Sequence, residues 1–252
     1  VAAQPAVPAR LPEPALAFAL AGHGLVARRG AVVPFPIRGA CAVGDGSRIV
    51  TAGEDGTARI WDGKTGEKLR VLTGHKAGVL YAVAFTDGAR VLTTSEDASA
   101  IIWDLETGLL VTRLEGHSTP VISAAVYPSG ERAVTVGLNG TRRIWDVKSQ
   151  RLAAVDEGAG PSKTAVAVFP DGDHVAVSSE SGKAEVWYGR TGELVAEVGA
   201  HRGAITALAV FADSSARVLT AGEDGFAAVW NSRSGVELAR LGPHDCAVLC
   251  VA

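Results

Sequence analysis

The five tryptophans of this 252-residue chain recur at nearly constant intervals of 42, 42, 42 and 43 residues. They are Trp61, Trp103, Trp145, Trp187 and Trp230. A fixed period of this size is typical of proteins built from repeated structural units, and it constrains the fold more tightly than chain length does. We therefore expect one domain over residues 1–252, divided into similar units.

Within a unit, other residues keep fixed distances from the tryptophan. Asp97 stands six residues before Trp103, and His75 stands 28 residues before it. Pairs such as Asp87-Gly88 punctuate each unit roughly every ten residues, and Asp-Gly is a signal for a tight hairpin turn. The segments between these pairs are short and rich in β-branched residues, which indicates strands. Four antiparallel strands per unit make one blade of a β-propeller, so we expect an all-β fold.

The repeated motifs resemble those of the WD40 family over about residues 33 to 252. They read Asp55 … Trp61-Asp62, Gly74-His75 … Asp97 … Trp103-Asp104, and Gly116-His117 … Asn139 … Trp145-Asp146. The resemblance implies four-stranded blades over residues 33–74, 75–116, 117–158, 159–200 and 201–240. Residues 1–32 and 241–252 would share a degenerate sixth blade, with strands expected near 6–11, 15–20, 25–29 and 247–252. The alternative is a part of a seven-bladed ring.

In this family the His, a Ser or Thr, the Asp and the Trp of a unit form a buried hydrogen-bond chain that holds the blade. Two units match fully and a third has Asn for Asp: His75/Thr93/Asp97/Trp103, His201/Thr220/Asp224/Trp230 and His117/Thr135/Asn139/Trp145. Two units depart from the pattern, with Val33 at the His position in one, and Ala159, Val177 and Ser181 in the other. A His-Asp-hydroxyl set also invites a catalytic interpretation. Because the set recurs with the period, whereas a catalytic set occurs once, we expect scaffolding.

The resemblance also places two rings of residues on the top face, where family members bind peptides or protein domains. The first ring lies five residues after each His position: Arg38, Leu80, Ile122, Thr164, Thr206 and Leu249. The second ring lies just before each Asp position: Glu54, Glu96, Leu138, Glu180 and Glu223. Apolar residues within an acidic surround favour a partner that bears Lys or Arg. The alternative is that these glutamates are only solvated loop residues.

Composition excludes several classes of function. The formal net charge is −3, so no basic excess favours nucleic acid. No apolar stretch is long enough to span a bilayer, and no basic segment introduces a signal peptide. The three cysteines, Cys41, Cys246 and Cys250, suit reduced thiols better than disulfides or a zinc site with His244. We expect no metal and no cofactor.

The expected function is that of a non-catalytic scaffold for protein–protein interactions, part of a larger complex inside the cell. The chain has no methionine, which favours a piece of a longer polypeptide. A cytoplasmic setting is expected, with a cytoskeletal or ciliary assembly as one candidate. The alternative is a sensor domain of a multidomain signalling ATPase or kinase. An enzyme with an active site in the channel is a third hypothesis, and it would need acid and base residues converging on the axis.

Overall fold

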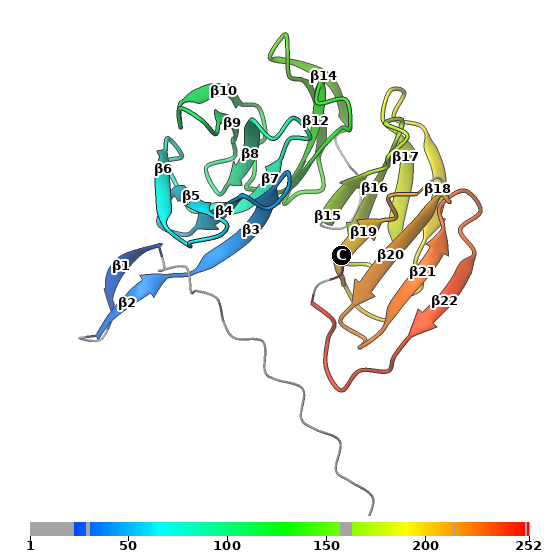
Figure 1. The fold of residues 1–252 in the computed structure, drawn as a ribbon. Coiled ribbons are helices and arrows are strands. Elements are labelled where there is room, and N and C mark those ends of the chain that lie inside the picture. The colour runs from blue at the N-terminus through cyan, green and yellow to red at the C-terminus, as the bar shows by residue number, and fades with distance from the viewer. Residues whose placement is uncertain (1–22, 29–30, 157–162, 214, 250, 252) are drawn as a thin grey trace, which may run out of the picture.

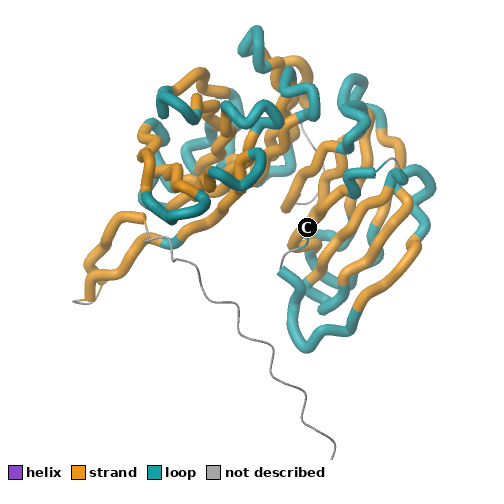
Figure 2. The backbone as a smooth tube through the Cα atoms, in the orientation of Figure 1, coloured by secondary structure: helices purple, strands orange, loops and turns teal. Residues whose placement is uncertain are grey.

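All regular elements that the structure describes are β-strands. The computed structural model describes residues 23–28, 31–156, 163–213, 215–249 and 251. Figure 2 shows these residues as strands joined by loops. In this part of the chain no helix is long and apolar enough to cross a membrane. The expected all-β class is confirmed.

The strands form one two-stranded sheet and five four-stranded antiparallel sheets, which we number as blades 1 to 5. The two-stranded sheet contains β1 (His23–Arg28) and β2 (Ala31–Phe35). Blade 1 contains β3 (Ile37–Val43), β4 (Arg48–Gly53), β5 (Thr57–Asp62) and β6 (Lys68–Thr73). Blade 2 contains β7 (Val79–Ala84), β8 (Arg90–Ser95), β9 (Ala100–Asp104) and β10 (Leu110–Leu114). Blade 3 contains β11 (Val121–Val126), β12 (Arg132–Gly137), β13 (Arg142–Asp146) and β14 (Arg151–Asp156). Blade 4 contains β15 (Lys163–Val168), β16 (His174–Ser179), β17 (Ala184–Tyr188) and β18 (Leu194–Val198). Blade 5 contains β19 (Ile205–Val210), β20 (Arg217–Gly222), β21 (Ala227–Asn231) and β22 (Glu237–Leu241).

Each blade follows the same local plan, which begins with its turns. The second and third strands of blade 1 are joined through Asp55-Gly56, and those of blade 5 through Asp224-Gly225. Gly56 and Gly225 both have φ of 78°, a left-handed conformation that glycine adopts without steric cost. The Asp side chain accepts a hydrogen bond from the N–H two residues later, as in Thr57 N to Asp55 Oδ1 at 3.0 Å. These turns fix which residues of each strand face the next blade.

The hydrophobic core lies between neighbouring blades. Four clusters of buried side chains each span one blade interface, from blades 1 and 2 through to blades 4 and 5. In the first cluster Val50 and Ile60 of blade 1 contact residues of blade 2 such as Val79 and Trp103. Each blade is therefore stabilised by its neighbours, because a single four-stranded sheet cannot bury both of its faces.

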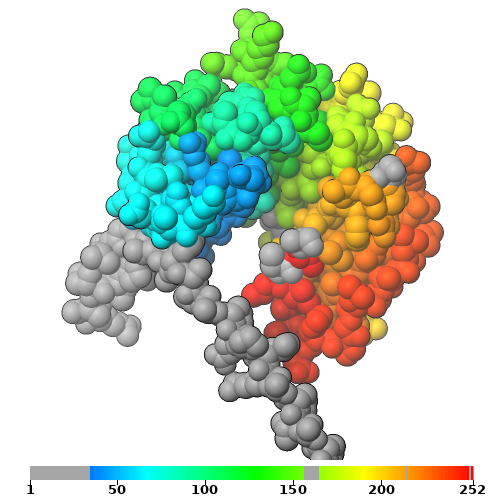
Figure 3. All heavy atoms as spheres, viewed as in Figure 1, coloured from blue at the N-terminus to red at the C-terminus, as the bar shows by residue number. Residues whose placement is uncertain are grey.

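The five blades stand in chain order around an arc that does not close (Figure 1). Figure 3 shows open space between blade 1, in blue and cyan, and blade 5, in orange and red. The exposure of equivalent first-strand residues agrees with this arrangement. Val79 and Val121 are fully buried at 0%, whereas Ile37, at the same position of blade 1, is 40% exposed. Among the described residues, no preceding blade covers Ile37.

The sheet expected to be shared by the two ends of the chain stays a prediction, because most of its strands lie outside the described residues. A strand does occur near residues 25–29, as expected, but it is β1, which pairs with β2. Only Arg29 and Gly30 separate these two strands, and a short local hairpin costs less loop-closure entropy than pairing with a remote segment. The strands expected at 6–11 and 15–20 lie outside the described residues. The number of blades in a complete ring, six or seven, stays a prediction.

The segment after β22 nevertheless makes backbone hydrogen bonds like those of a segment that leads into another blade. His244 N donates to Gly225 O at 2.8 Å, as His201 N does to Gly182 O at 3.2 Å one blade earlier. Val248 N donates to Gly222 O at 3.2 Å, and the Thr206 hydroxyl donates to Val248 O. The described residues of this segment therefore lie against blade 5 where a next first strand would begin, but they form no strand.

Candidate functional site

The polar network of blade 2 connects four side chains, which come from two strands, a loop and a turn. Trp103 Nε1 donates to Thr93 Oγ1 at 2.8 Å, and Thr93 Oγ1 lies 2.9 Å from His75 Nε2. His75 Nδ1 lies 3.1 Å from Asp97 Oδ2. With the proton on Nδ1, the ring donates to Asp97 and accepts the Thr93 hydroxyl proton, so one tautomer satisfies every group. The network ties the loop before β7 to the β8–β9 turn.

The carboxylate of Asp97 is the centre of charge in this network. Its Oδ2 also accepts Lys76 N at 2.8 Å, and its Oδ1 accepts Ser99 Oγ at 2.6 Å. Burial by itself raises the pKa of Asp97, but the bonds from Ser99, Lys76 N–H and His75 outweigh it and hold this pKa well below its usual range. Burial lowers the pKa of His75, against the opposing pull of Asp97. The pair is therefore an ionised carboxylate beside a neutral ring at neutral pH.

Blade 5 repeats this arrangement with its own residues. Trp230 Nε1 donates to Thr220 Oγ1 at 2.8 Å, and His201 Nε2 lies 2.8 Å from the same hydroxyl. His201 Nδ1 lies 2.9 Å from Asp224 Oδ1. The imidazoles of both blades are buried, with 1% of the His75 side chain and none of the His201 side chain exposed. Both rings are therefore closed to a substrate in this structure, and their hydrogen bonds connect elements within one blade.

Blade 1 keeps the hydrogen bond between tryptophan and threonine, and an arginine takes the place of the histidine. Trp61 Nε1 donates to Thr51 Oγ1 at 2.8 Å. Arg59, two residues before the tryptophan, places Nη2 3.1 Å from Asp55 Oδ2. The Asp55 carboxylate is thus paired with a cation from β5, where blades 2 and 5 pair it with a histidine from the preceding loop. Sequence reasoning missed Arg59, although the period places it two residues before its tryptophan, as it does Ile101 and Arg143.

Blade 3 has the histidine but lacks the carboxylate. Trp145 Nε1 and His117 Nε2 each lie 2.8 Å from Thr135 Oγ1. Asn139 Oδ1 accepts Thr141 N at 3.2 Å and the Thr119 hydroxyl at 3.1 Å, but it does not bond to His117. His117 Nδ1 therefore has no hydrogen-bond partner among the described residues. Burial, with a smaller effect of the Arg143 charge, lowers the pKa of His117 to about 4.

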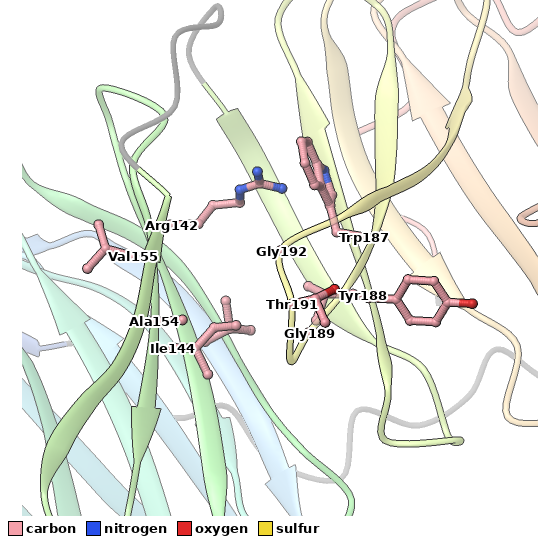
Figure 4. A pocket seen from close by; sticks show the side chains of 11 residues that line it. Arg142, Ile144, Ala154, Val155, Trp187, Tyr188, Gly189, Thr191 and Gly192 are labelled. Carbon is pink, nitrogen blue, oxygen red and sulfur yellow. The ribbon is translucent and has the colours of Figure 1, made fainter.

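Blade 4 lacks the network, and its tryptophan is used differently. Trp187 Nε1 donates to Glu185 Oε2 at 3.2 Å, because Val177 stands at the Thr position and offers no hydroxyl. Arg142 of blade 3 lies over the indole, with its guanidinium carbon 3.8 Å from the ring centroid. Figure 4 shows Arg142 reaching toward Trp187 across the space between the two blades. Ser181 bonds to Ser179, and Ala159 lies outside the described residues.

The space beside Arg142 is a small pocket between blades 3 and 4. Ile144, Val155, Tyr188 and Gly192 are among its lining residues, and it encloses about 80 Å³. Pockets that hold cofactors or drug-sized ligands span roughly 300–1,000 Å³. In the described part of the chain no three His, Cys, Asp or Glu side chains gather as metal ligands do. Cys41 and Cys246 are free thiols, and burial raises the pKa of Cys41 to about 11.

The glutamates expected on the top face differ in what they contact. Glu54 forms an ion pair with Arg38, and Glu223 Oε2 accepts Ala204 N at 3.3 Å. Glu96 and Glu180 are exposed and form no ion pair with a described residue. Backbone bonds such as Glu96 N to Gly78 O, at 3.0 Å, join the end of the second strand to the loop before the first strand in blades 1, 2, 3 and 5. The ring positions therefore share one end of the blades.

The apolar and remaining positions of the top face are also not equivalent. Leu138 is 45% exposed and Leu249 is 74% exposed, whereas Leu80 and Ile122 are half-buried. Thr206 donates to Ala221 O at 3.1 Å and to the segment after β22, so its hydroxyl serves blade 5 itself. Thr164 lies in β15.

Comparison with known families agrees with these repeats. The family described as WD domain, G-beta repeat, matches residues 34–62, 66–104, 108–146 and 192–231, which is more than half of the chain. Three of these segments end at the Asp that follows the tryptophan, and the fourth ends at Asn231. The unmatched residues 147–191 include the first three strands of blade 4, where the network is missing. A search of curated proteins gives no match. The chain belongs to the WD40-repeat family.

Proposed function

We propose that this protein binds a partner protein on the top face of blades 2 to 4, through a basic residue and an apolar anchor of the partner. WD40 repeats form protein-interaction modules, which gives the general function. The finer proposal rests on one repeat position, the residue just before the Asp position of the turn between the second and third strands. In blades 2, 3 and 4 this residue is Glu96, Leu138 and Glu180. An exposed leucine flanked by two glutamates that lack a cation suits a Lys- or Arg-bearing segment.

The two flanking blades offer less to such a partner. On blade 1, Glu54 already forms an ion pair with Arg38. On blade 5, Glu223 already accepts a hydrogen bond from Ala204 N. A partner would have to break these contacts before it could use either carboxylate. The proposed surface therefore consists of Glu96, Leu138 and Glu180, and excludes Glu54 and Glu223.

A pull-down with the immobilised protein tests the surface, with extract from its own source as the partner pool. The double variant Glu96→Lys/Glu180→Lys is expected to lose the partners that the wild type retains, and the loss should deepen with Leu138→Asp. Glu193→Lys is the matched control, because Glu193 is exposed in the β17–β18 turn, at the other end of blade 4. An unchanged set of partners in the double variant would refute the proposed surface.

Two other hypotheses carry less support. A sensor domain of a signalling ATPase or kinase would use the same kind of surface, so it differs from a scaffold in the neighbouring domains and not in this one. An enzyme would need accessible acid and base groups, whereas the His-Asp sets of blades 2 and 5 are buried. Membership of a larger complex and an intracellular location stay predictions from the sequence.

A further inference from the structure

Blades 1 and 3 carry the same polar residues at four repeat positions and differ in one atom type at a fifth. Thr51, Thr57, Arg59 and Trp61 of blade 1 correspond to Thr135, Thr141, Arg143 and Trp145 of blade 3. At the fifth position blade 1 has Asp55 and blade 3 has Asn139. The change removes a negative charge and one acceptor oxygen from a site that keeps its cation.

The groups that a carboxylate satisfies in other blades lack an acceptor in blade 3. In blade 2 Asp97 Oδ2 accepts both His75 Nδ1 and Lys76 N, at 3.1 and 2.8 Å. In blade 3 His117 Nδ1 is buried without a partner, and the N–H of Ser118, at the Lys76 position, donates to no described residue. In blade 2 the two equivalent donors share one carboxylate oxygen, whereas in blade 3 neither donor has an acceptor among the described residues.

The Thr141 hydroxyl and the Arg143 guanidinium of blade 3 also lack the carboxylate that their counterparts in blade 1 contact. Thr57 Oγ1 donates to Asp55 Oδ1 at 2.7 Å, whereas the buried Thr141 Oγ1 has no partner. Arg59 reaches a carboxylate through Nη2, whereas Arg143 reaches none among the described residues. The pair of Arg59 and Asp55 shows that an arginine at this position has the length to reach an anion there.

Rotation of the Asn139 amide cannot repair the deficit. An amide offers one acceptor oxygen, where a carboxylate offers two. Asn139 Oδ1 already accepts Thr141 N and the Thr119 hydroxyl, and turning the amide would aim its NH2 group at those donors. In either orientation one set of donors is left without an acceptor. Asn139 is exposed, so its side chain can turn outward and admit another group.

We propose that the top of blade 3 binds an oxyanion, the carboxylate or phosphoryl group of an acidic ligand, in the place where Asp97 holds its Oδ2 in blade 2. His117 Nδ1–H, Ser118 N–H and the Thr141 hydroxyl donate to its oxygens, and Arg143 supplies the opposite charge. Arg143 Nη1 lies about 3 Å from where a Cβ on Gly116 would stand, and Gly116 is exposed, so the guanidinium is near solvent. Charge-assisted bonds of this kind are the strong ones in proteins. The site is independent of the proposed partner surface, because it requires an acidic ligand and not a basic one.

Titration with small anions tests the site in the intact chain. Sodium acetate and inorganic phosphate are added at an ionic strength matched with sodium chloride, and amide and imidazole resonances are followed by NMR. We expect saturable shifts at His117 Nδ1 and Ser118 N that chloride does not produce, with a matching rise in melting temperature. The tighter of the two anions identifies the source as an acidic side chain or a phosphorylated one. A response to acetate and phosphate no larger than that to chloride would overturn the proposal.

Two variants supply the controls. Asn139→Asp places the missing carboxylate inside the protein, so this variant should melt at a higher temperature and no longer respond to either anion. Arg143→Ile copies Ile101 of blade 2 and should weaken anion binding about tenfold or more, the loss of a charge-assisted bond. An Asn139→Asp variant that still binds anions as the wild type does would also refute the site. Because no partner protein enters these measurements, their outcome is separate from that of the pull-down.

Discussion

Arg59 Nη2 lies 3.1 Å from Asp55 Oδ2, and this contact performs in blade 1 the pairing that His75 performs in blade 2. Only 14% of the Arg59 side chain and 9% of the Asp55 side chain are exposed. Successive blades therefore pair the carboxylate at this repeat position with two different donors, an arginine in blade 1 and a histidine in blade 2. In each, a carboxylate buried in the β-turn between the second and third strands needs a donor from another element.

The first prediction concerns this pair. Arg59→Leu is expected to lower the free energy of unfolding by about 3 kcal/mol, because it leaves the Asp55 carboxylate buried without its cation. Asp55→Asn combined with Arg59→Leu should cost less than the sum of the two single changes, with a coupling energy of about 1–3 kcal/mol. Urea denaturation of the four proteins measures the coupling, and strictly additive costs would show that the contact contributes nothing.

The second prediction concerns the histidine network. His75→Ala should lower stability by about 1–3 kcal/mol, since it removes one hydrogen bond from Asp97 and one from Thr93 in a buried network. His244→Ala is the matched control, because His244 stands at the same repeat position but is exposed, and it should change stability by less than about 0.5 kcal/mol. Thermal melts that do not distinguish the two variants would contradict a bracing role for His75.

The third prediction concerns acid. The pKa of His117 is lowered from 6.5 to about 4, so the unfolded chain takes up a proton at a higher pH than the folded chain does. Its contribution to stability is present above pH 6.5 and is lost as the pH falls toward 4, at up to about 1.4 kcal/mol per pH unit. The pKa of His75 is shifted in the same direction. His117→Gln should flatten the slope of unfolding free energy in this range, and an unchanged slope would contradict the burial of a neutral imidazole.

A separate loss is expected at lower pH. The pKa of Asp97 is held below its usual 3.8 by its hydrogen bonds, which outweigh burial, so its contribution to stability is present above that value and is lost as the pH falls below it. Asp97→Asn should remove this second loss while leaving the one from His117. The same denaturation series, continued to lower pH, provides the measurement.

The fourth prediction compares two residues at one repeat position. Val79→Ala should cost about 1–3 kcal/mol, because Val79 is fully buried between blades 1 and 2. Ile37→Ala should cost less than about 1 kcal/mol, although it removes more atoms, because Ile37 is 40% exposed at the open end of the arc. A large cost at Ile37 would show that a further sheet covers blade 1 in solution.

Part of the site followed from the spacing of residues. The network residues of blade 2 stand at spacings that recur in other blades, and hydrogen bonds connect them in the structure. They are His75, Thr93, Asp97 and Trp103. Arg59 and Arg143 recur at the same spacing, but they were not selected from the sequence, because an arginine within a strand has no fixed role. Whether it pairs depends on a carboxylate that is remote along the chain or absent. The use of Trp187 as a platform for Arg142 could not be predicted either, since the two residues come from different blades.

The sequence by itself determined the blades, because their hydrogen bonds and turns are local. Strand alternation, Asp-Gly turns and a period of 42 residues specify each four-stranded sheet without reference to the rest of the molecule. The tertiary structure alone decided that β1 pairs with β2 and which polar groups find partners. The pairing of β1 with β2 closes a short loop and therefore costs less entropy than pairing with a remote segment. Whether a buried donor forms a hydrogen bond depends on which acceptor the packing of the blades places beside it.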